Sequence, residues 1–88
     1  MTQEEIKKTK EILEKVQKCI SGCHDYYVFY CMGSEQWYDY YVTFTVFGSS
    51  DQGEGSEWTE DWCIYSDGRI RRDGEVYNNF DEFERNWV

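Results

Sequence analysis

Four cysteines and one histidine are the residues of this sequence best suited to metal or nucleophilic chemistry. Cys19, Cys23 and His24 lie close together, and Cys31 or Cys63 would complete a tetrahedral zinc site. However, the C-x3-C-H spacing is not that of a zinc knuckle, and unpaired cysteines are often buried as small apolar groups. We therefore expect reduced thiols packed in the core and no bound metal. Two disulfides would be the alternative in a secreted protein.

Catalysis finds little support in the same residues. Cys23 and His24 are adjacent in sequence, whereas a nucleophile and its base usually meet through the fold. An imidazole just past a helix is more simply explained by its favourable interaction with the helix dipole. The carboxylates are so numerous that no pair stands out for acid–base work, and no phosphate-binding glycine loop or H-E-x-x-H motif occurs. We predict a protein that is not an enzyme and uses no cofactor.

The most informative chemical feature is the distribution of charge. The 88 residues carry 18 Asp and Glu against 9 Lys and Arg, a formal net charge of −9. No Lys or Arg occurs between Lys18 and Arg69. That stretch holds nine carboxylates: Asp25, Glu35, Asp39, Asp51, Glu54, Glu57, Glu60, Asp61 and Asp67. Because like charges repel, such a surface is explained either by solubility alone or by a positively charged partner.

Composition excludes several functional classes. No apolar run is long enough to cross a membrane, and no signal segment opens the sequence, so we expect a cytoplasmic protein. Aromatic residues make up 19% of the chain, which argues against disorder. Direct binding of nucleic acid needs a basic surface, and the cluster Arg69, Arg71 and Arg72 is offset by neighbouring acids.

An amphipathic helix is predicted over residues 2–21. Thr2 and Glu5 form a capping-box pattern at its start, and Gly22 can end it in the left-handed conformation. Apolar residues recur at helical spacing: Ile6, Ile12, Leu13, Val16, Cys19 and Ile20. A helix with such a stripe needs another element to cover.

Extended segments follow this helix. Residues 25–32 and 37–47 are predicted strands, and alternation in the second assigns to the core face Tyr38, Tyr40, Val42, Phe44 and Val46. Residues 48–56 have the composition of a loop, and further strands are expected near 57–66, 69–72 and 75–77. A short helix is expected from the N-cap Asn79 to about Trp87.

These elements predict a single domain, residues 1–88, of the α+β class. We expect a two-layer sandwich: the N-terminal amphipathic helix packed on a three- or four-stranded antiparallel meander, followed by the short C-terminal helix.

Charge and aromatic density together predict a small acidic inhibitor that occupies the basic groove of a nucleic-acid-handling protein. We expect no direct contact with nucleic acid or membrane. The predicted partner-binding carboxylates are Asp39, Asp51, Glu54, Glu57, Glu60 and Asp61. Trp37 or Trp58 is expected to supply an aromatic anchor, because Trp is enriched at interface hot spots.

At the level of class, the chain resembles the small acidic inhibitors carried by phages and mobile elements. These include anti-CRISPR and anti-restriction proteins, some of them DNA mimics, and uracil-glycosylase inhibitors. It is also similar in kind to acidic immunity proteins that neutralise basic nuclease toxins. The resemblance rests on size, aromatic density and the stretch without basic residues, so it assigns no functional residue. Two alternatives stay open: an immunity protein, or a homo-oligomeric interaction module with no inhibitory role.

Overall fold

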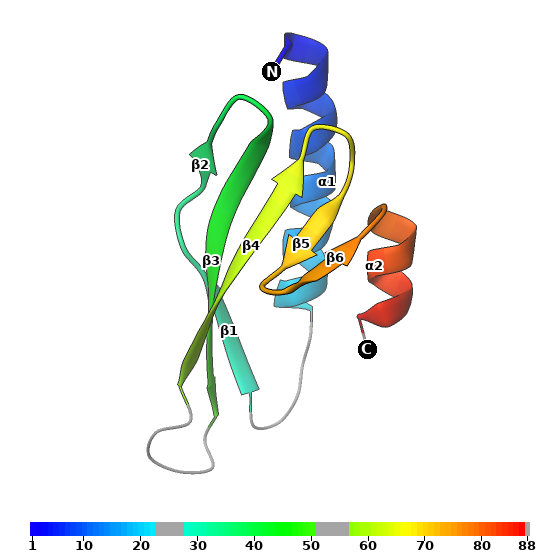
Figure 1. The fold of residues 1–88 in the computed structure, drawn as a ribbon. Helices are drawn as coiled ribbons and strands as arrows, with labels where there is room; N and C mark the ends of the chain where they lie inside the picture. The colour runs from blue at the N-terminus through cyan, green and yellow to red at the C-terminus, as the bar shows by residue number, and fades with distance from the viewer. Residues whose placement is uncertain (23–27, 51–56, 88) are drawn as a thin grey trace.

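The fold comes from a computed structural model, which describes residues 1–22, 28–50 and 57–87 (Figure 1). The elements are α1 (Gln3–Ser21), β1 (Val28–Met32), β2 (Gln36–Trp37), β3 (Tyr41–Ser50), β4 (Trp58–Tyr65), β5 (Ile70–Arg72), β6 (Glu75–Tyr77) and α2 (Phe80–Asn86). The α+β class is confirmed, with a helix, an antiparallel sheet and a short helix in the predicted order.

The sheet has six strands rather than three or four. Its order is β1-β3-β4-β5-β6, and β2 pairs with β3 on the same edge as β1. The chain between β1 and β2 stays close to β3, because the amide of Gly33 donates a hydrogen bond to the carbonyl of Thr45 at 2.7 Å. The long pair β3–β4 is the centre of the sheet, and β4 carries three of the predicted binding residues, Trp58, Glu60 and Asp61.

Helix α1 begins with the predicted capping box. The Glu5 amide donates to Thr2 Oγ1 and the Thr2 amide donates to Glu5 Oε1, both at 3.2 Å. The helix is capped by Gly22, but φ there is −84° rather than left-handed. The Gly22 amide still donates to the Lys18 carbonyl at 2.8 Å, so the end of the helix is satisfied without a positive φ.

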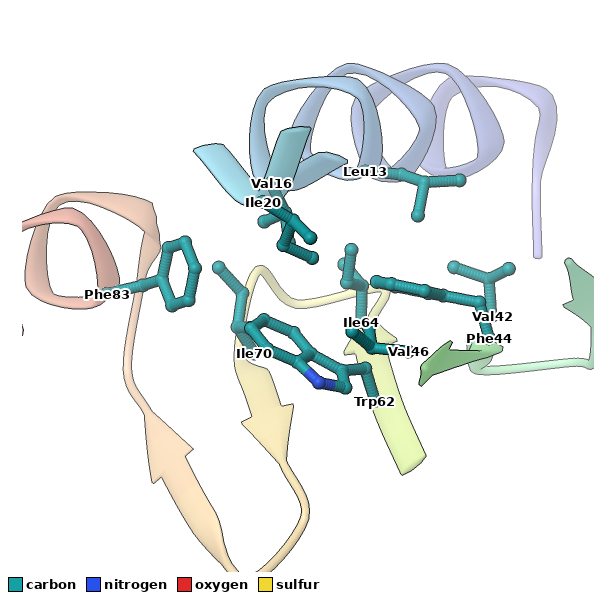
Figure 2. Close-up of a cluster of buried hydrophobic side chains, with 10 residues drawn as sticks. All are labelled: Leu13, Val16, Ile20, Val42, Phe44, Val46, Trp62, Ile64, Ile70 and Phe83. Atoms are coloured by element: carbon teal, nitrogen blue, oxygen red, sulfur yellow. The ribbon is translucent and has the colours of Figure 1, made fainter. Parts of the chain in front are cut away.

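The core lies between the helices and one face of the sheet (Figure 2). Its members are Leu13, Val16, Ile20, Val42, Phe44, Val46, Trp62, Ile64, Ile70 and Phe83. On α2, Phe83 meets the Trp62 ring edge-on at 5.6 Å, and the Trp87 indole N–H donates to the Cys19 carbonyl of α1 at 3.1 Å. Both helices therefore contact the same buried layer.

The predicted alternation of β3 is confirmed for Val42, Phe44 and Val46, which are buried. Tyr38 and Tyr40 were expected on the same face, but both are exposed. The reason is that β3 begins at Tyr41, so the preceding residues belong to the β2–β3 turn and not to the strand.

Candidate protein-binding surface

The predicted contact residues do not form a single cluster. Asp51 and Glu54 lie outside the described residues. Asp39 lies in the turn between β2 and β3, whereas Glu57 lies just before β4, at the opposite end of the β3–β4 pair (Figure 1). Strand β4, which runs between these two ends, has eight residues and is roughly 25 Å long at the ordinary rise per residue of a strand. One compact ligand cannot contact Asp39 and Glu57 together.

Glu60 and Asp61 are adjacent in sequence but lie on opposite faces of β4. Glu60 pairs in register with Val46, on the core face, and Asp61 pairs with Thr45 on the other face. The Arg72 guanidinium donates to both Glu60 oxygens, from Nε at 2.8 Å and from Nη2 at 3.3 Å. These bonds raise the pKa of Arg72 and balance the Glu60 charge inside the molecule.

The two predicted anchors differ in environment. The indole of Trp58 lies against Gly48, where an added Cβ would come within 2.2 Å of the ring, and its edge contacts Tyr30. Trp37 is exposed and lines a hollow of about 380 Å³ with Tyr38 and the N-terminal turns of α1. Trp37 is therefore the more accessible of the two rings.

The face of the sheet opposite the core, here called the open face, carries a different set of side chains. In register across β1, β3 and β4, Cys31, Phe47 and Thr59 form one row, with Thr45 and Asp61 in the next. Phe47 is 46% exposed, and Cys31, Thr59 and Asp61 are also exposed. A large apolar ring thus stands uncovered among small and acidic side chains.

A hollow of about 480 Å³ lies at this end of the open face. Phe47, Thr59 and Glu57 border it, together with Gly48 and Trp58. The hollow places one predicted carboxylate, Glu57, beside Phe47, which was not among the predicted contacts, whereas the Trp58 ring lies against Gly48 on the core face. The signal for Phe47 was present, because alternation in β3 places it on the same face as the threonines.

Charge on the open face is unevenly distributed. Glu57 and Asp61 form no ion pair with another described residue. Arg71 is a basic residue of this face, opposite Cys63 on β4, and its Nε is buried without a hydrogen-bond partner among the described residues. The end of the face around Phe47 is therefore acidic, and positive charge lies toward β5.

The cysteines occupy three different environments. Cys63 is buried as expected and Cys19 is half-buried, and burial raises the pKa of both thiols. Cys31 is exposed on the open face, contrary to the expectation of core packing, because it lies on a strand at the sheet edge. Cys23 and His24 lie outside the described residues. The described part of the chain contains no group of three potential metal ligands.

Comparison with protein-family models, with curated proteins and with solved structures finds no match for this chain. Within the described ranges, no helix is both long enough and apolar enough to cross a membrane. An uncovered aromatic ring near carboxylates that pair with no described basic residue favours contact with cationic side chains.

Proposed function

We propose that this protein is a small acidic binding protein, not an enzyme, that docks on the basic groove of a nucleic-acid-handling protein. The observation that carries the proposal is the acidic end of the open face, where exposed Glu57 and Asp61 accompany the exposed ring of Phe47. The sequence supports it, because no Lys or Arg occurs between Lys18 and Arg69. Grooves built to meet phosphates offer the complementary charge.

Inhibition by competition is the consequence of such docking. A carboxylate surface and a nucleic acid cannot occupy one basic groove together, so the protein acts in the manner of a DNA mimic of the anti-CRISPR or anti-restriction kind, in the cytoplasm. An immunity protein for a nuclease toxin would use the same surface chemistry. The identity of the captured partner distinguishes these two functions.

A homo-oligomeric interaction module is the second candidate function. The exposed apolar residues near the β2–β3 turn and the start of α1 favour it. Ile6, Trp37, Tyr38 and Tyr40 are all exposed, and the first three line one hollow beside Asp39. Exposed aromatic groups of this kind mark interaction sites. Because the net charge of −9 opposes self-association, added salt should promote dimers, which sedimentation velocity detects.

The test of the main proposal combines capture with charge reversal. The tagged protein is incubated with cell extract at about 50 mM salt, bound proteins are identified, and each is purified and titrated up to about 300 mM salt. The reversal variant is E57K/D61K, and the matched control is E11K/E84K, which changes charge equally on exposed helix positions. Glu60 is left unchanged because its reversal would break the pair with Arg72.

The proposal expects a nucleic-acid-binding partner that duplex DNA displaces and that dissociates as salt rises. E57K/D61K should slow association by at least about tenfold, because electrostatic steering changes on-rates by that order or more. E11K/E84K should retain most of the wild-type rate. Retention of the partner at high salt, or equal rates for the two variants, would contradict docking through the open face.

A further inference from the structure

We propose that Phe47, Glu57 and Asp61 form a binding site for an arginine side chain of the partner, with the guanidinium stacked on the Phe47 ring. This inference rests on the proposed function, because it names the contact that would hold the basic protein. The three residues are called the arginine site below.

The register of the sheet brings the arginine site together. Phe47 of β3 pairs with Thr59 of β4, and Glu57 and Asp61 lie two residues before and after Thr59. A two-residue step along an extended chain keeps the same face and covers roughly 7 Å. Asp61 therefore shares the face of Phe47, and Glu57 lies beside the ring because both residues line the hollow of about 480 Å³.

Elsewhere in the described residues, an arginine contacts both a carboxylate and an aromatic ring at two places. Arg72 donates to Glu60 at 2.8 Å, and its Cζ lies 4.8 Å from the centre of the Trp87 ring. Arg69 donates to Asp67 at 2.8 Å, and its Cζ lies 4.5 Å from the centre of the Tyr65 ring. These are the two ion pairs within the described residues, and in each an arginine joins a carboxylate to an aromatic face.

The arginine site has the ring and the carboxylates but no arginine of its own. Glu57 and Asp61 pair with no basic residue in the described part of the chain, and the segments 23–27 and 51–56 contain no Lys or Arg in sequence. An arginine for this site is therefore expected from another molecule.

Arginine suits the site better than other partner side chains. Its planar guanidinium stacks on a ring while its edge N–H groups remain free to donate to carboxylates, whereas a lysine ammonium is a compact charge with stronger hydration. An apolar side chain would cover Phe47 but would desolvate the nearby carboxylates without compensation. Nucleic acid would be repelled by the same carboxylates.

The test uses hexa-arginine and hexa-lysine peptides as probes, followed by amide NMR titration at about 50 mM salt. Hexa-arginine should bind more tightly than hexa-lysine and should shift the amides of Thr45, Phe47, Thr59 and Asp61. Phe47→Leu, which keeps an apolar group but removes the ring, should weaken hexa-arginine binding about two- to fivefold. Phe47→Tyr should restore it, and the dispersion of the spectra shows that each variant is folded.

Charge variants complete the test. E57Q/D61N should weaken hexa-arginine binding more than E11Q/E84Q, which removes the same charge from the helices. If hexa-arginine binds but Phe47→Leu has no effect, or if its shifts map elsewhere, the arginine site is overturned and the proposed function stands. Equal affinity for both peptides would overturn the preference for arginine. Absence of binding by either peptide would overturn the site and the proposed function together.

Discussion

Replacing Glu60 or Asp61 by its amide should separate stability from binding, although the two residues are neighbours in sequence. Glu60→Gln alters a carboxylate whose side chain is only 16% exposed and which accepts two hydrogen bonds from Arg72. Asp61→Asn alters an exposed carboxylate that forms no ion pair with a described residue. The first change should lower the free energy of unfolding, and the second should lower affinity for cationic ligands.

The expected magnitude follows from the Arg72 contact. A hydrogen bond to a charged group contributes about 1.5–3 kcal/mol, and Gln retains one acceptor but loses the charge. Because the Arg72 side chain is 30% exposed, solvent screens part of the loss, so Glu60→Gln should cost about 1–2 kcal/mol. In a domain of this size that lowers Tm by about 5–15 °C. Asp61→Asn should stay within about 0.5 kcal/mol of wild type.

Urea unfolding followed by tryptophan fluorescence measures both variants, since Trp62 and Trp87 lie next to the Arg72 guanidinium. The control is Asp67→Asn, which alters an ion pair with Arg69 at the same N–O distance, 2.8 Å, but with side chains 56% and 49% exposed. An exposed pair of this kind contributes at most about 1 kcal/mol.

Two results would refute this reasoning. If Glu60→Gln costs no more than Asp67→Asn, burial does not distinguish the two ion pairs energetically. If Glu60→Gln weakens hexa-arginine binding as much as Asp61→Asn does, the two carboxylates do not have separate roles, and the assignment of the open face as the binding face is wrong.

Two further predictions concern packing and pH. Gly48→Ala should destabilise the fold by about 1–3 kcal/mol and change tryptophan fluorescence, because the new Cβ would lie 2.2 Å from the Trp58 indole. The control is Gly74→Ala, whose new Cβ would have nothing within 4 Å. Equal urea midpoints for the two variants would contradict the close packing of Gly48 against Trp58. The Glu5 carboxylate accepts the Thr2 amide hydrogen bond, which lowers its pKa, so its stabilisation of α1 is present at neutral pH and is lost as pH falls through that lowered pKa. The Tm difference between wild type and Glu5→Ala should therefore shrink on acidification, and a difference independent of pH would contradict the capping role of the carboxylate.

Local features of the fold could be predicted because they depend on residues a few positions apart. The capping box of Thr2 and Glu5 formed as expected, and Asn79 caps α2 by accepting a hydrogen bond from the Glu82 amide at 2.8 Å. The alternation of β3 correctly assigned Val42 to the core, because successive side chains of a strand point to opposite faces. Tyr40 was misassigned because the same alternation was extended through a turn.

The amino-acid sequence by itself determined the helix–sheet–helix order, the α+β class and the stretch that lacks basic residues, all of which follow from neighbouring residues or from composition. It did not separate β2 from β3, and it assigned Gly48–Ser50 of β3 to a loop. The tertiary structure alone decided which carboxylates are available. Arg72 neutralises Glu60 across the β4–β5 pair, whereas Asp61, one residue further on, stands exposed near the ring of Phe47. The physical reason is that pairing and burial depend on strand register and on the face that the helices cover, and both bring together residues distant in sequence.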